Sequence, residues 1–212
     1  MNRKNITNDK KQFIDSLQKV GIHPSALQLE ACDTYVNNLI KWQKKINLVG
    51  SSTLQEPYTR HVLDAAQLAH LVPRGTLLDV GSGAGIPGLI LSIFADNPIT
   101  LCERNTKKTS FLNNMIRKLS LENKCNVLTQ DASDINQSFD SITGRAVTNI
   151  SHFLSITHQQ RHPDTLYILQ KGKGAEEELN AAYEFWHFDC SNHNSVVNPD
   201  SKVLLISNVR ER

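Results

Sequence analysis

Hydrophobic residues recur at helical spacing through the first part of the chain. Phe13, Leu17 and Val20 are separated by the three- and four-residue intervals of one helix face. After Pro24 a second apolar stripe at the same kind of spacing predicts a longer helix. This stripe consists of Leu29, Cys32, Val36, Leu39, Ile40 and Ile46. Residues 1–60 are therefore expected to form a helical extension.

From Thr76 onward the pattern changes to short apolar runs that alternate with helical segments. Seven runs are predicted as strands: 76–80, 98–102, 126–129, 139–143, 165–170, 184–188 and 202–209. Four segments are predicted as helices: 86–95, 106–119, 148–160 and 175–182. This alternation, ending in two consecutive strands, predicts an α/β fold with a mostly parallel sheet. We expect residues 61–212 to form this domain and to pack with the extension as one unit.

Composition restricts the class of protein. The chain has 212 residues with 39% hydrophobic and 21% charged, enough for a sizeable core and unlike a disordered chain. No apolar run is long enough to span a membrane, and the N-terminus lacks the apolar stretch of a secretory signal. A cytoplasmic protein is expected. Net charge is +2, which neither requires nor excludes a nucleic-acid partner.

Cysteine and histidine spacing does not indicate a metal site. The four cysteines, at 32, 102, 125 and 190, form no CxxC pair, so reduced thiols are expected. His158 and His162 have the i, i+4 spacing that can place two imidazoles on one metal, but HQQRH lacks the glutamate of a zinc-protease motif. Because Pro163 follows, an exposed helix end is the expected structure there, and no metal is predicted.

The most informative segment is LLDVGSGAGIPG at 77–88, a buried strand followed by a glycine-rich turn and a helix start. Such a turn lets a ligand approach the backbone closely. Gly83-x-Gly85-x-x-Gly88 matches the dinucleotide fingerprint, with Glu103 where a ribose-binding acid belongs, so an NAD-dependent oxidoreductase is one interpretation. The G-x-G-x-G register preceded by Asp79 instead resembles the cofactor loop of class I S-adenosylmethionine-dependent methyltransferases. That resemblance implies a Rossmann-like seven-stranded sheet with one antiparallel strand near its end.

Further blocks narrow the resemblance. They are Trp42 with Asn47-Leu48, RHVLD at 60–64, the glycine turn, Lys108 with Phe111-Leu112, Phe139-Asp140, Arg145-Ala146 and Lys171-Gly172. In this order they resemble the bacterial small-subunit ribosomal RNA guanine-N7 methyltransferases, the RsmG or GidB family. The match covers residues 38–173 well, and the N-terminal helices and last hairpin more loosely.

The resemblance implies a set of donor-binding residues. Gly81, Gly83, Gly85 and Ile86 would shape the donor pocket, Glu103 would hold the ribose, and Ala132-Ser133 would flank the adenine. Arg145 would orient the cofactor or the base. Three positions depart from the family: it usually has aspartate at 103, often glutamate at 133, and often arginine at 131, where this chain has Asp131.

Each assignment has a structural alternative. Asp79 could brace the turn, Glu103 could be a solvated strand end, and Arg145 could pair with Asp140 or Asp131. Six lysines are candidates for RNA phosphate contacts: Lys41, Lys44, Lys45, Lys107, Lys108 and Lys171. Those near the end of the second helix would also complement its dipole without any RNA.

The resulting expectation is a methyltransferase that uses S-adenosylmethionine to methylate N7 of a guanosine in 16S rRNA of the small ribosomal subunit. Guanine N7 carries a free lone pair, so no general base is needed and the absence of an obvious catalytic triad is expected. The target base would be unstacked from a loop. The resemblance implies a monomer, with no protein partner. A non-catalytic ribosome-assembly factor with the same fold is the third interpretation, favoured by Asp131 and Ser133.

Overall fold

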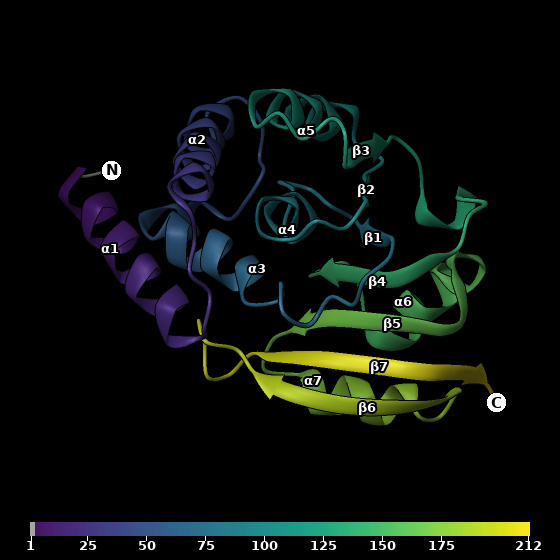
Figure 1. Cartoon of the computed structure of the whole chain (residues 1–212). Helices are drawn as coiled ribbons and strands as arrows, with labels where there is room; N and C mark the ends of the chain where they lie inside the picture. The colour runs from purple at the N-terminus through teal and green to yellow at the C-terminus, as the bar shows by residue number, and fades with distance from the viewer. Residues whose placement is uncertain (1–2) are drawn as a thin grey trace.

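A computed structural model describes residues 3–212 of the chain (Figure 1). Seven strands form one sheet in the order β3-β2-β1-β4-β5-β7-β6. The strands are β1 (Leu77–Val80), β2 (Ile99–Cys102), β3 (Cys125–Leu128), β4 (Phe139–Arg145), β5 (Arg161–Lys171), β6 (Trp186–Asn194) and β7 (Lys202–Glu211). All neighbouring pairs are parallel except those that involve β7, so β7 is the one antiparallel strand of the sheet. The predicted α/β fold and its seven-stranded, mostly parallel sheet are confirmed.

Helices cover both faces of the sheet. The α-helices are α1 (Arg3–Lys19), α2 (Ala26–Gln43), α3 (Asp64–Ala66), α4 (Gly88–Phe94), α5 (Thr106–Lys118), α6 (Ile150–Ile156) and α7 (Ala175–Ala182). Shorter turns are the 3₁₀ segments η1 (Ser51–Gln55), η3 (Ala132–Asp134) and η4 (His158–Gln160), and η2 (Tyr58–Leu63) is a π-helix. None of the helices within residues 3–212 combines the length and apolar character that crossing a bilayer requires.

The core consists of two hydrophobic layers, one on each face of the sheet. Alternate strand residues belong to different layers: Leu77 and Ile168 lie in the first, and Leu78 and Leu169 in the second. This alternation follows from the two-residue period of a strand. The first layer is covered by α1, α2, α3, α4 and α5, and the second by α6 and α7 (Figure 1).

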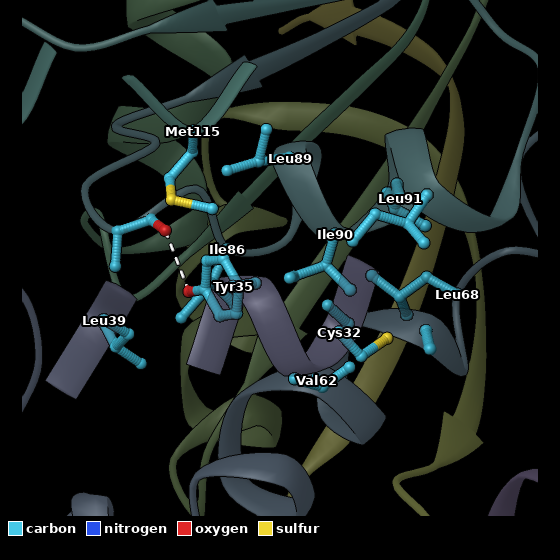
Figure 2. Packing of buried hydrophobic residues seen from close by; sticks show 14 of the residues in the cluster. Cys32, Tyr35, Leu39, Val62, Leu68, Ile86, Leu89, Ile90, Leu91 and Met115 are labelled. Atoms are coloured by element: carbon cyan, nitrogen blue, oxygen red, sulfur yellow. Dashed lines mark hydrogen bonds between the residues drawn. The ribbon is translucent and has the colours of Figure 1, made fainter. Parts of the chain in front are cut away.

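The N-terminal helices share the first core layer with the sheet. Phe13 and Leu17 of α1 and Tyr35 and Leu39 of α2 are fully buried in the same cluster as residues of β1 and β2. Helix α2 begins at a capping box in which Ser25 and Gln28 exchange backbone and side-chain hydrogen bonds. Figure 2 shows Tyr35 and Leu39 in the same buried cluster as Leu89 of α4 and Met115 of α5.

The predicted boundaries around Pro163 differ from the structure. The helix expected over 148–160 ends at Ile156, and the next residues form a short 3₁₀ turn. Strand β5 then begins at Arg161, so Pro163 lies inside a strand and not after a helix. The pairing of β4 with β5 is irregular between Phe139 and Ser141, which accommodates a residue without an N–H donor.

Candidate functional site

Side chains capable of binding a ligand gather at one edge of the sheet. Strands β1 to β5 are parallel, so their carboxyl ends lie at the same edge. Gly81, Glu103 and Asp131 come after the ends of β1, β2 and β3, and Arg145 and Lys171 are the last residues of β4 and β5. The strand order reverses between β1 and β4, and ligands of open α/β sheets bind in the crevice at such a reversal.

The glycine turn requires backbone conformations that only glycine adopts easily. Gly81, Gly83 and Gly85 have φ angles of +68°, +55° and +81°, all in the left-handed region. A Cβ at Gly85 would lie 2.6 Å from Leu89 Cβ, so this glycine also allows the turn to pack on α4. Close packing of the turn therefore leaves no room for a side chain.

Asp79 braces the turn from below. Its carboxylate Oδ2 accepts a hydrogen bond of 3.1 Å from the Gly88 N–H, and its side chain is fully buried. The other oxygen, Oδ1, has no hydrogen-bond partner among the described residues. Burial raises the pKa of Asp79 to about 7, against the opposing effect of the Gly88 N–H. The geometry therefore shows Asp79 in a structural role, in which it braces the turn.

Glu103 links the turn to the next helix. Its Oε2 accepts from the Gly83 N–H at 3.0 Å, and its Oε1 accepts from the Asn105 N–H at 2.8 Å. Asn105 in turn caps α5, because its side chain accepts hydrogen bonds from the first-turn amides of that helix. The residue as a whole is 8% exposed, so Glu103 is not a solvated strand end.

A cavity of about 490 Å³ lies beside the turn, and we call it the glycine-turn pocket. It brings together four residues that the sequence singled out for donor binding: Gly81, Glu103, Ala132 and Ser133. Its remaining lining residues, which the sequence analysis did not assign to this site, are Val80, Cys102, Arg104, Gln130, Asp131, Val147, Thr148, His152 and Ile156, together with Lys108, a candidate for RNA contact. The pocket is large enough for a cofactor-sized ligand.

Three predicted loop residues support this pocket without lining it. Gly83 donates its N–H to Glu103, and Gly85 packs against Leu89. The Ile86 side chain is 4% exposed and belongs to the first core layer, where Figure 2 shows it near Tyr35. The Ile86 side chain therefore anchors the glycine turn in the core.

Arg145 lies in a neighbouring cavity of about 370 Å³, which we call the Arg145 pocket. It is lined by Asp64, Arg145, Ala146, Val147, Thr148, Gln170, Lys171, Gly172, Glu178, Ser195, Ser201, Lys202 and Val203. The two pockets share Val147 and Thr148, so they adjoin across the loop that follows β4. Arg145 was expected at the cofactor or the base, and it does not line the glycine-turn pocket.

The guanidinium of Arg145 is held by the segment before β1. Nη1 donates to Asp64 Oδ2 at 2.9 Å and to the Arg60 carbonyl at 3.2 Å. Neither Asp140 nor Asp131 is its partner, which corrects that alternative: Asp140 pairs with His162 and Asp131 with Arg104. The partner Asp64 lies 81 positions away in sequence, in the RHVLD block.

The π-helix η2 places His61 beside Arg145, and Asp64 follows it as the first residue of α3. Burial, and secondarily the charge of Arg145, lowers the pKa of His61 to about 3, so the imidazole is neutral at physiological pH. Its Nε2 lies 2.9 Å from Thr53 Oγ1 and its Nδ1 lies 3.4 Å from Arg145 Nη2. The buried Asp9 of α1 fixes the start of this π-helix, because its carboxylate accepts from the amides of Tyr58 and Thr59. Such irregular turns occur frequently at functional sites.

The six candidate lysines fall into two groups. Lys41, Lys44, Lys45 and Lys107 are exposed and Lys108 is half-buried. Lys171 differs from these, because its ammonium donates to Glu178 Oε2 at 2.8 Å and to the Thr148 carbonyl at 2.6 Å. Its side chain is 9% exposed. Lys171 therefore links Thr148 and Glu178 in the lining of the Arg145 pocket, and its ammonium is not free in solvent.

The histidine pair does not occupy one helix end. His158 lies in the 3₁₀ turn η4, whereas His162 lies in β5, with its Nε2 3.4 Å from Asp140 Oδ1. The expected exposed helix end at this position was wrong. Within residues 3–212, no group of three or more His, Cys, Asp or Glu side chains is arranged to hold a metal ion.

Solved structures that are similar to this fold include methyltransferases. The chain superposes on magnesium protoporphyrin IX methyltransferase from Synechocystis PCC 6803, solved with bound S-adenosylmethionine, with a TM-score of 0.58. The alignment covers 89% of this chain and 99% of that one at 13% sequence identity. The fold is therefore that of the class I S-adenosylmethionine-dependent methyltransferases.

Sequence comparison identifies the family within that class. Residues 28–205 match the profile of the GidB family, described as rRNA small subunit methyltransferase G. Ribosomal RNA small subunit methyltransferase G of Paramagnetospirillum magneticum is 33% identical over 198 residues, covering 91% of this chain and 94% of that protein. The protein of that name from Rhodopseudomonas palustris is 35% identical over 198 residues, covering 89% and 87%. The chain belongs to the rRNA small subunit methyltransferase G family, which confirms the resemblance found in the sequence.

The raised pKa of Asp79 predicts a pH-dependent contribution to stability. An unfolded Asp titrates near pH 4, whereas buried Asp79 titrates near pH 7. Between these values the folded state binds a proton that the unfolded state does not, so the free energy of unfolding falls as pH rises. In Asp79→Asn the amide does not titrate and its oxygen can still accept from Gly88. We expect the stability of the wild type relative to this variant to fall between pH 4 and 7, with a slope of up to about 1.4 kcal/mol per pH unit.

Urea unfolding of both proteins at several pH values checks this prediction. Other titrating groups, such as His61, contribute equally to both proteins and cancel in the difference. Parallel pH profiles for wild type and variant would contradict it.

Proposed function

We propose that this protein transfers a methyl group from S-adenosylmethionine to N7 of a guanosine in 16S rRNA of the small ribosomal subunit. The observation that carries the proposal is the glycine-turn pocket with the Glu103 carboxylate on its wall, in a chain of the rRNA small subunit methyltransferase G family. Membership in this family favours methyl transfer over the NAD-dependent oxidoreductase.

The residues of the glycine-turn pocket fit this cofactor. Glu103 accepts one N–H on each carboxylate oxygen, and each oxygen retains a lone pair for a ribose hydroxyl. A Cβ at Gly81 would lie 3.0 Å from Val147 Cγ2, so a side chain there would narrow the pocket between its two walls. When bound, S-adenosylmethionine supplies an electrophilic methyl group on a sulfonium. In this proposal Gly81, Glu103, Ala132 and Ser133 bind it, while Gly83, Gly85 and Ile86 shape the turn.

Although residues 131 and 133 differ from those often found in the family, the glycine-turn pocket still has an acidic side chain near the proposed adenine site. Ser133 has a hydroxyl where the family often has a carboxylate, but the Asp131 carboxylate lines the same pocket. Asp131 is 57% exposed and its pairing with Arg104 spans 3.6 Å at the surface, so little free energy opposes a change of partner. We therefore assign polar contacts with the adenine to Asp131 and Ser133 together.

The Arg145 pocket is the proposed site of the target base. It adjoins the glycine-turn pocket and lies at the carboxyl ends of β4 and β5. Arg145 is an anchored donor that can face the O6 acceptor of guanine, while N7 keeps its lone pair free for attack. The neutral His61 behind Arg145 is not required as a base, because guanine N7 carries no proton. Catalysis then consists mainly of positioning.

Five lysines form the proposed phosphate-binding edge. Helices α2 and α5 are in contact: Asn38 accepts a hydrogen bond from Lys118, and Trp42 packs against Phe111. This arrangement places Lys41, Lys44 and Lys45, at the end of α2, toward the first turn of α5, which carries Lys107 and Lys108. Cations in the first turn of a helix oppose its dipole, so these two lysines are better explained by an anionic ligand than by helix stability.

The remaining parts of the proposal concern the whole molecule. Residues 1–60 are an extension that packs with residues 61–212 as one unit, supported by the shared core layer and by the π-helix that spans residue 60. The protein acts in the cytoplasm as a monomer on ribosomal RNA, with an unstacked loop guanosine as target.

Transfer of labelled methyl from S-adenosylmethionine to small subunits that lack the modification tests the function. We expect label at N7 of one guanosine and none when that position carries 7-deazaguanosine, which has no N7 nucleophile. Donor binding without label would place the substrate elsewhere. Neither binding nor label would favour the non-catalytic assembly factor.

Replacement of Glu103 by alanine should weaken donor binding by at least about tenfold, because it removes the ribose acceptor and one support of the turn. RNA affinity should change little. Calorimetric titration with S-adenosylmethionine checks this, with Glu122→Ala, which removes an exposed carboxylate, as the control. Equal donor affinity in the Glu103 variant would remove the assignment.

Reversing the charge of Lys44 and Lys45 together should reduce the salt dependence of RNA binding. Each lost phosphate contact lowers the slope of log affinity against log salt by about 0.7 to 0.9. Affinity measured from 50 to 200 mM salt gives this slope. The matched control reverses Lys11 and Lys19, exposed on α1. If the Lys44 and Lys45 variant keeps the wild-type slope, these lysines belong to a solvated helix end.

A further inference from the structure

The glycine turn receives a hydrogen bond from a distant part of the chain. Several of its contacts come from the adjoining strands: Glu103 accepts from Gly83, the Asp79 carboxylate accepts from Gly88, and the Asp79 carbonyl accepts from the Ser82 hydroxyl. Another comes from α2, where the Tyr35 hydroxyl donates to the Ala84 carbonyl at 2.9 Å (Figure 2). Tyr35 precedes Ala84 by 49 residues and lies in the N-terminal extension.

This bond fixes one peptide unit of the turn at both of its polar groups. The peptide between Ala84 and Gly85 has its carbonyl bonded to Tyr35, while its N–H donates to the Ser82 carbonyl at 2.6 Å. Rotation of this peptide would break both bonds. Because Gly83 and Gly85 flank Ala84 and allow many backbone conformations, the turn has little stiffness of its own at this position.

The Tyr35 hydroxyl cannot be replaced by water without rearrangement. Tyr35 is fully buried and Ala84 is 4% exposed. The ring of Tyr35 packs edge-on against Phe111 at 6.4 Å between centroids, and Phe111 in turn packs against Trp42. The donor is therefore held in one place by aromatic packing between α2 and α5.

We infer that Tyr35 is a positioning residue for donor binding: its hydroxyl holds the Ala84 carbonyl so that the glycine turn is already in its binding conformation before the cofactor arrives. The inference rests on the proposed function of the glycine-turn pocket. A turn that must be ordered on binding costs affinity, and a turn ordered beforehand does not. The N-terminal extension thus contributes to the donor site without touching the donor.

The test compares Tyr35→Phe with Tyr167→Phe in the full-length chain. Tyr167 is the matched control: it is fully buried, packs edge-on against Phe153 at 6.3 Å, and bonds through its hydroxyl to Thr157 at 3.2 Å. It lies in the second core layer, on the other face of the sheet. Each variant loses one buried hydroxyl, so both should show a similar decrease in Tm.

Calorimetric titration with S-adenosylhomocysteine separates the two variants. We expect the Kd to rise about three- to tenfold in Tyr35→Phe and to stay within twofold of wild type in Tyr167→Phe. The KM for S-adenosylmethionine should rise in the same proportion, with kcat at saturating donor and KM for RNA unchanged. Amide exchange in residues 81–88 of the unliganded protein should be faster in Tyr35→Phe alone.

An unchanged Kd in Tyr35→Phe, or an equal rise in both variants, would overturn the inference and leave Tyr35 a purely structural residue. The wild type in the same titrations reports on the proposed function separately. A wild type that binds the ligand while Tyr35→Phe binds it equally well refutes only the role of Tyr35. A wild type that does not bind refutes the donor site and this role together.

Discussion

The buried hydrogen bond from the Gly88 N–H to Asp79 is the contact on which the site depends. It joins the end of β1 to the start of α4 and forces the residues between them into a tight turn. The approach is close enough that a Cβ at Gly88 would lie 2.6 Å from Asp79 Cβ and from Leu101 Cδ2. The cost is a carboxylate kept out of water with one oxygen unpartnered, which is reflected in its raised pKa. The hydrogen bonds from Glu103 and Tyr35 act on residues between the two ends that this bond joins.

Much of the fold is predictable because buried parallel strands are short apolar runs separated by helices. The first four strands and the final antiparallel strand were predicted close to their observed positions. Strand β6 was predicted to end at residue 188 but extends to Asn194, since an edge strand that is largely exposed has polar residues and no apolar alternation. The π-helix was missed because its start is fixed by Asp9, and the sequence gives no sign of that partner.

The site likewise has residues whose positions follow from the local sequence pattern and residues whose contacts depend on distant parts of the chain. Gly81, Glu103, Ala132 and Ser133 follow consecutive strand ends, so their positions along the chain are enough to bring them to one pocket. The partner of Arg145, the burial of Lys171 and the contact of Tyr35 with the glycine turn depend on how separate layers pack. Spacing along the chain carries no information on such contacts. The sequence therefore predicts which residues lie at this edge of the sheet. The orientation of their side chains depends on tertiary packing.

The contacts of α1 and α2 also bear on the order in which the protein is made. These helices precede the sheet in the chain, yet Asp9 bonds to residues 58 and 59, Tyr35 to residue 84, and Asn38 to residue 118. Helix α1 packs on the nearby η2, but α2 packs on α4 and α5, which are synthesised only after the first and second strands. Closing such long segments costs chain entropy, which local helix formation does not repay. We therefore expect α2 to dock late, so that the cofactor turn becomes rigid only after the sheet beneath it exists.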